Sequence, residues 1–165
     1  EKLSLLDNLL LYLGKHPVEW PFHRLLQRRS LARDISIDKE RVLEKLASLL
    51  GRDHVFCRNH DQTASGLSYA EQRLLSIAGL MMGEADLLLI DEPTSGINID
   101  FHDTLRDWIG RVKQQGRTVF MIEHNMDFVR NTADTCHYMG GGMIQYSGSP
   151  EEVLANAEVQ KEYLI

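Results

Sequence analysis

Two short runs of apolar residues, without polar alternation, predict strands in the second half of the chain. The first is 87–90, LLLI, which lies directly before Asp91, Glu92 and a Pro-Thr-Ser-Gly turn. The second is 118–122, TVFMI. Runs this short and this apolar are typical of strands that are buried on both faces of a parallel sheet. We therefore expect two buried strands, the first of which ends sharply at the turn that follows it.

Between these strands, apolar residues recur at the spacing of one face of a helix. They are Phe101, Leu105, Trp108, Ile109 and Val112. The helix is expected to end near Gly116. Strand, helix and strand in this order form a βαβ unit, whose strands are parallel and whose carboxyl ends meet at one edge of the sheet. We therefore expect Asp91 and Glu92 to lie beside Glu123 and His124, at the edge where α/β proteins bind ligands.

Leucines at helical spacing organise the first part of the chain. They predict amphipathic helices over 3–13 and 38–50, each followed by a glycine. Another helix is expected to begin at Ser68, because Ser68 and Glu71 form a capping box ahead of further apolar residues at helical spacing. Its first-turn amides and the Ser68 hydroxyl are a candidate anion site, with simple helix capping as the alternative.

The end of the chain predicts a β-hairpin and helices. Residues 136–139 and 143–146 are expected strands joined by three glycines, which supply the positive φ that a tight hairpin turn requires. The tail from Pro150 predicts two short helices. The whole pattern indicates an α/β fold, with a helical subdomain over 1–83 and, over 84–165, a parallel βαβ core with a C-terminal hairpin and helices.

Composition narrows the class of protein. The chain has 165 residues, 43% of them hydrophobic and 25% charged, which fits one globular domain or one domain with a small subdomain. A net charge of −6 argues against a general nucleic-acid binder, and no nucleic-acid partner is expected. Cys57 and Cys136 lie far apart, which favours a reduced, cytoplasmic protein. With no signal peptide and no apolar run long enough to span a bilayer, we expect membrane association only through a partner.

One segment has the opposite charge to the chain. Between residues 15 and 33, five lysines and arginines stand against Glu19, a balance of +4, and Trp20 and Phe22 lie among them. This segment is either a docking surface for a partner or a solvated face with Trp20 over the core.

The acidic residues after the first strand suit metal-assisted hydrolysis of a nucleotide. A carboxylate in this position can hold Mg²⁺, directly or through water, while its neighbour orients and deprotonates an attacking water. His124 is expected beside them. The alternatives are an ordinary acidic loop for Asp91 and Glu92, and a helix-capping role for His124.

Three motifs in register resemble those of ATP-binding cassette (ABC) ATPases. LSYAEQR at 67–73 is similar to the signature motif, LLLIDEPTSGIN at 87–98 to the Walker B motif and D-loop, and MIEH at 121–124 to the switch-histidine motif. The LSY variant and the closing GSPEEVLANAEVQKEYL resemble most the ATPase subunits of bacterial branched-chain amino-acid importers. The resemblance implies a partial P-loop NTPase (ABC ATPase) fold.

The family's phosphate loop is missing from this pattern. None of the 165 residues forms the GxxxxGK[ST] sequence whose amides and lysine would hold the nucleotide phosphates. The resemblance begins just after the family's glutamine loop. We therefore expect part of a longer ATPase that is inactive alone, or a natural remnant of one.

The resemblance implies a role for each motif residue. Asp91 would help to hold Mg²⁺, Glu92 would act as general base on the attacking water, and His124 would contact the γ-phosphate of ATP. Signature residues would contact ATP held by a second ATPase domain: Ser68, Tyr69, Ala70, Glu71 and Gln72. The D-loop residues that would line this head-to-tail dimer interface are Ser95, Gly96, Ile97 and Asn98.

The signature departs from the family pattern at two positions. Ala70 replaces a usual glycine, which adds a methyl group where the backbone would approach phosphate. Glu71 replaces a usual glutamine, which brings a carboxylate near a polyanion. Both put a close contact with phosphate in doubt, although a Glu71 folded back into the capping box would soften the penalty.

The function implied by the resemblance is an ATP- and Mg²⁺-dependent ATPase subunit that drives solute transport, of the amino-acid import type. Its partners would be a second ABC ATPase domain, identical or paralogous, and transmembrane permease subunits that hold it at the inner face of the cell membrane. One alternative is a non-catalytic module that presents the signature helix and the 15–33 segment to partners. Another, an ABC ATPase of DNA repair or translation, is disfavoured by the absence of coiled-coil heptads and by the acidic composition.

Overall fold

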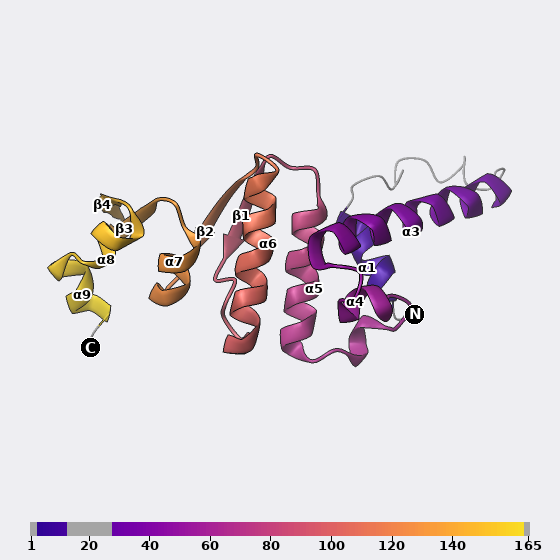
Figure 1. Ribbon diagram of the computed structural model, residues 1–165, viewed down its shortest axis with the longest axis horizontal. Coiled ribbons are helices and arrows are strands. Elements are labelled where there is room, and N and C mark those ends of the chain that lie inside the picture. Colours follow the sequence, from indigo (N-terminus) through magenta and orange to yellow (C-terminus); the bar gives the residue numbers. More distant parts are fainter. Residues whose placement is uncertain (1–2, 13–27, 164–165) are drawn as a thin grey trace.

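The computed structural model describes residues 3–12 and 28–163 (Figure 1). Trp20, Phe22 and most of the basic 15–33 segment therefore lie outside the described residues. Within the described ranges, no helix is both long enough and apolar enough to cross a bilayer.

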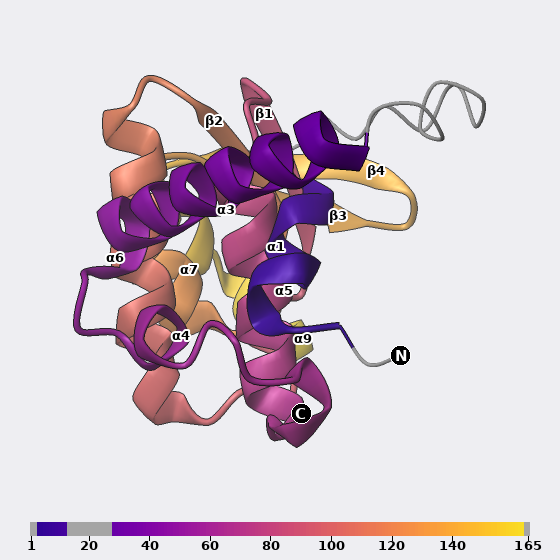
Figure 2. The same cartoon turned by 90° about the vertical axis from the view of Figure 1, so that its right-hand side faces the viewer.

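Helices make up the first part of the described chain, as predicted. They are α1 (Leu5–Tyr12), α3 (Arg28–Leu50), α4 (Val55–Arg58), the 3₁₀ turn η1 (Ala64–Gly66) and α5 (Tyr69–Met82). Helix α3 begins at Arg28, ten residues before the predicted start at Asp38. Figure 2 shows α3 lying across α1, α5 and α6, all of which it contacts. Helix α1 approaches α5 closely at Gly79, where an added Cβ would lie 2.4 Å from Cδ2 of Tyr12.

The predicted βαβ unit is confirmed. It consists of β1 (Leu87–Asp91), the turn η2 (Ile99–Phe101), α6 (His102–Gln114) and β2 (Thr118–Ile122). The two strands are parallel, in a register that runs from Leu87 opposite Thr118 to Asp91 opposite Ile122. Their carboxyl ends therefore meet at one edge of the sheet.

The prediction that both strands are buried on both faces was wrong for the described residues. Leu88 is 1% exposed, whereas the next residue, Leu89, is 66% exposed. Phe120 and Ile122 on β2 are likewise exposed. The physical reason is that α6 packs against one face of this two-stranded sheet, while none of the described elements shields the apolar side chains of the other face.

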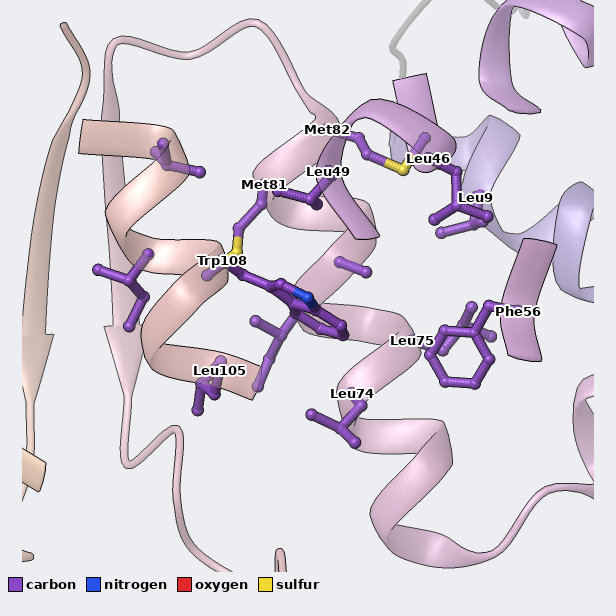
Figure 3. Close-up of a cluster of buried hydrophobic side chains, with 14 of the residues drawn as sticks. Leu9, Leu46, Leu49, Phe56, Leu74, Leu75, Met81, Met82, Leu105 and Trp108 are labelled. Atoms are coloured by element: carbon purple, nitrogen blue, oxygen red, sulfur yellow. The ribbon is translucent and has the colours of Figure 1, made fainter. Parts of the chain in front are cut away.

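Helices α5 and α6 join the helical part to the sheet through a shared hydrophobic core (Figure 3). Trp108 of α6 lies between the two helices and is almost fully buried. Arg111 of α6 donates hydrogen bonds to the carbonyls of Ser48 and Leu49, at 3.2 and 2.9 Å, and so caps the C-terminus of α3. One core thus spans both sides of residue 83, and the predicted division into 1–83 and 84–165 stays a prediction.

The C-terminal elements form a smaller unit at one end of the molecule (Figure 1). They are α7 (Met126–Thr132), β3 (Cys136–Gly140), β4 (Met143–Gly148), α8 (Pro150–Leu154) and α9 (Ala157–Tyr163). The predicted hairpin and two short helices are confirmed, and Gly141 and Gly142 have the positive φ of the turn, 58° and 79°. A second hydrophobic cluster, Tyr138, Val153 and Val159, holds this unit together.

Candidate active site

The ends of β1 and β2 bring Glu92 and His124 together, as the βαβ prediction requires. Nδ1 of His124 lies 3.5 Å from Oε1 of Glu92, and both side chains remain partly open to solvent. A water molecule can therefore reach the Glu92 carboxylate. Asp91 ends β1 directly beside this pair, with its side chain exposed.

Glu92 has a strained backbone. Its φ is +45°, a left-handed conformation that a non-glycine residue reaches at a cost of about 1–3 kcal/mol and that is found mainly at functional sites. Three hydrogen bonds hold this conformation. The Glu92 N–H donates to the Ile122 carbonyl at 2.8 Å, and the Glu92 carbonyl accepts from the Ser95 N–H at 3.1 Å and from Arg73 Nη2 at 2.5 Å.

Arg73 was not expected at this site. It lies on α5 as the last residue of LSYAEQR, and its guanidinium reaches the carbonyls of both Asp91 and Glu92. The contact fixes the start of the signature helix against the end of β1. The cationic residue within the motif was the available signal in the sequence, but a contact across 18 positions could not be inferred from local spacing.

Glu123 lies at the predicted edge of the sheet, but the sequence did not indicate which groups it binds. Its Oε1 accepts hydrogen bonds from the N–H and the hydroxyl of Thr94, at 2.8 and 2.5 Å. Its Oε2 accepts from the N–H groups of His124 and Asn125, at 2.9 and 3.0 Å. Partial burial raises the pKa of Glu123, but these hydrogen bonds outweigh it and hold the pKa below its usual value. The carboxylate thus links the loop after β1 to the loop after β2.

The signature residues begin α5 in the predicted capping box. Ser68 Oγ accepts from the Glu71 N–H at 3.3 Å, while Glu71 Oε2 accepts from the N–H and the hydroxyl of Ser68, at 2.8 and 2.7 Å. The Ser68 hydroxyl lowers the pKa of Glu71. Glu71 is therefore folded back, as the sequence suggested. Ala70 is half-buried, and the Gln72 side chain donates to the Leu67 carbonyl at 2.9 Å.

The signature and the turn after β1 meet at Tyr69 and Gly96. Gly96 has a φ of +71°, a left-handed conformation that favours glycine. A Cβ on it would lie 2.8 Å from Cε1 of Tyr69, so the exposed Tyr69 ring would have to shift. Of the four residues expected at a dimer interface, Ser95 is half-buried while Gly96 and Asn98 are exposed. Ile97 differs, because its side chain is buried in the core and is not available to a partner.

The acidic residues fit a magnesium ion that is shared with a nucleotide. Among residues 3–12 and 28–163, no three His, Cys, Asp or Glu side chains gather closely enough to form a metal site by themselves. Mg²⁺ usually binds through one or two carboxylates, with waters and substrate phosphates completing its shell. Asp91, with Glu92 beside it, is the group that could supply such a carboxylate.

Comparison with known sequences identifies a family. The sequence model of the family described as ABC transporter matches residues 3–95. A probable branched-chain amino acid transport ATP-binding protein LivG of Archaeoglobus fulgidus is 30% identical over 165 residues, which are 99% of this chain and 61% of that protein. The high-affinity branched-chain amino acid transport ATP-binding protein LivG of Escherichia coli is 28% identical over 99% of this chain and 62% of its own length. The chain thus spans about three fifths of these relatives.

Comparison with solved structures supports the fold. The ADP conformation of an ATP-binding cassette of an ABC transporter superposes with a TM-score of 0.73 at 23% identity, over 99% of this chain and 63% of that one. A putative metal-chelate type ABC transporter in an inward-facing conformation gives the same TM-score at 18% identity, over 99% of this chain and 59% of its own. The expected α/β fold of the P-loop NTPase class is therefore confirmed.

Proposed function

Because the chain belongs to the ABC transporter family, we propose that it supplies the hydrolytic carboxylates, the switch histidine and the signature motif of a transport ATPase. The observation that carries the proposal is the contact of His124 with Glu92, on a strained backbone at the carboxyl ends of two parallel strands. Strain of this kind persists only where the surrounding structure holds it, as Arg73, Ile122 and Ser95 do here.

In the proposed reaction, each side chain has one task. Glu92 takes a proton from a water that attacks the γ-phosphate of ATP, and His124 donates a hydrogen bond to that phosphate. Asp91 holds Mg²⁺, which neutralises charge on the nucleotide phosphates when it is bound. The exposure of Glu92 and His124 suits this role, because nucleotide and water must both reach them.

We propose further that the site is completed by a second ATPase domain. Ser68, Tyr69, Ala70, Glu71 and Gln72 face the ATP of that partner, and Ser95, Gly96 and Asn98 line the shared interface. Permease subunits in the membrane bind the two ATPase domains at the inner face of the membrane and transport a solute. The names of the Archaeoglobus fulgidus and Escherichia coli relatives support a branched-chain amino acid as that solute.

The test restores a phosphate loop. An upstream ATPase segment that carries a GxxxxGK[ST] phosphate loop is fused ahead of Glu1, and ATP hydrolysis is measured for the fusion and for Glu92→Gln in it. We expect Glu92→Gln to lower kcat by about 10²–10⁴ while ATP binding is retained, because only proton transfer is lost. Glu151→Gln, an exposed carboxylate on α8, is the matched control. The 165-residue chain alone is expected to be inactive, and unchanged turnover in Glu92→Gln would remove the catalytic assignment.

A further inference from the structure

The Glu123 carboxylate joins the two loops that carry Glu92 and His124. Thr94 lies two positions after Glu92, and His124 directly follows Glu123. The hydrogen bond from the Glu92 N–H to the Ile122 carbonyl continues the pairing of the two strands. Among the described residues, the hydrogen bonds between segments 93–96 and 123–125 are those that Thr94 donates to the Glu123 carboxylate. Beyond the end of the β1–β2 pairing, this carboxylate is therefore the described link between the loop that follows Glu92 and the loop that begins with His124.

Only an ionised carboxylate fits the donors around it. Both oxygens of Glu123 face two donors each, and all four donors come from N–H or O–H groups. A glutamine could satisfy one side with its oxygen, but its amide would then turn two hydrogens toward N–H groups on the other side. An aspartate is one methylene shorter and could not span both loops. The chemistry at this position is thus specific to glutamate.

We propose that Glu123 is a positioning residue that sets the separation of Glu92 and His124. The assignment rests on the proposed function for its consequence, but the geometry itself can be tested without nucleotide. We call the Glu123 carboxylate and its four hydrogen bonds the Glu123 clamp. Thr94 is buried and its hydroxyl is directed at Glu123, so the clamp has a fixed end on the β1 side. On the β2 side, the clamp holds the backbone N–H of His124 itself and thereby orients the start of the loop that carries the imidazole.

The test uses the 165-residue chain and NMR of its histidine rings at one fixed pH. The measured quantity is the shift of the His124 ring resonances caused by Glu92→Gln. In the parent chain we expect a clear shift, because the carboxylate lies 3.5 Å from the ring nitrogen. With Glu123→Gln in the background, we expect the two loops to move apart. The effect should then fall to about half or less, because the Coulomb interaction between Glu92 and His124 halves when their separation doubles.

Matched variants separate positioning from general stability. Thr94→Val removes one donor to Glu123 and should also reduce the Glu92 effect, whereas Thr94→Ser keeps the hydroxyl and should preserve it. Asp127→Asn, an exposed carboxylate nearby, should leave the effect unchanged. Val153→Ala destabilises the separate C-terminal cluster and should likewise leave the Glu92 effect unchanged. If Glu123 acted only by stabilising the fold, Val153→Ala would reduce the effect as well.

The outcomes decide the inference independently of ATP hydrolysis. An undiminished Glu92 effect in folded Glu123→Gln, or in Thr94→Val if the first variant does not fold, would overturn it. In the fusion that carries a phosphate loop, Glu123→Gln should lower kcat by about tenfold to a hundredfold with the KM for Mg-ATP unchanged, and Thr94→Ser should retain activity. A fusion without ATP hydrolysis would refute the proposed function, while the NMR result would still stand for the geometry.

Discussion

Two neighbouring leucines on β1 offer a direct test of how the sheet is covered. Leu88 is 1% exposed and Leu89 is 66% exposed, so the same substitution probes opposite faces of one strand. Leu88→Ala removes a side chain from the core that also contains Ile90 and Trp108, and should lower the free energy of unfolding by about 2–5 kcal/mol. Leu89→Ala should change it by less than about 0.5 kcal/mol.

The comparison is internally matched. Both residues pair with β2, opposite Val119 and Phe120, so the loss of strand propensity is similar for both and cancels in the difference. What remains is the burial and cavity contribution of Leu88. The assay is urea unfolding followed by far-UV circular dichroism at several protein concentrations, with the slopes compared to check that the unfolded states are alike.

Two results would refute the reasoning. Equal losses for Leu88→Ala and Leu89→Ala would mean that both faces of β1 are covered in solution. A loss for Leu89→Ala that grows with protein concentration would show that another copy of the chain covers the exposed face. Either result would show that the second face of the β1–β2 sheet is covered in solution. Leu89, Phe120 and Ile122 would then not be accessible to solvent.

Two further predictions follow from helix packing and from the Glu123 clamp. Gly110→Ala in α6, where a Cβ meets open space, should stabilise the protein by about 0.5–1 kcal/mol. Gly79→Ala should destabilise it, because the added methyl meets the Tyr12 ring. Thermal unfolding measures both variants, and stabilisation by Gly79→Ala would contradict the contact with Tyr12. The folded-state pKa of Glu123 is lowered, so its stabilisation is fully present above its unfolded pKa near 4.5 and is lost as pH falls through the folded value. Glu123→Gln should therefore flatten this acid-side loss in urea titrations, and an unchanged pH profile would contradict it.

The elements of the fold were predictable because their signals are local. The capping box at Ser68, the helical spacing that ends in Trp108 and Val112, and the apolar run of TVFMI each depend on residues a few positions apart. The juxtaposition of Glu92 and His124 then followed from the handedness and parallel pairing of a βαβ unit. The order of strand, helix and strand was thus enough to predict that Glu92 and His124 lie close together.

The remaining features depend on distant partners or contradict a local preference. A residue that precedes proline is normally extended, so the left-handed Glu92 before Pro93 gave no signal in the sequence. The contacts of Arg73 with Glu92 and of Glu123 with Thr94 join segments 19 and 29 positions apart. The exposed face of β1 could not be inferred either, because an apolar run is the same whether or not a second layer covers it.

The capping box adds a condition to the proposed contact between the signature and phosphate. A serine hydroxyl has one hydrogen to donate, and that of Ser68 is given to Glu71. The Ser68 N–H is also given to Glu71. A phosphate that approached this end of α5 would meet a carboxylate already in its place, and two anions cannot share these donors without strong repulsion. Under the proposed function, the folded-back position of Glu71 therefore does not soften the penalty that the sequence suggested, and Glu71 must turn away before Ser68 can bind the partner's ATP. The pair is exposed at the start of α5, which leaves room for this movement.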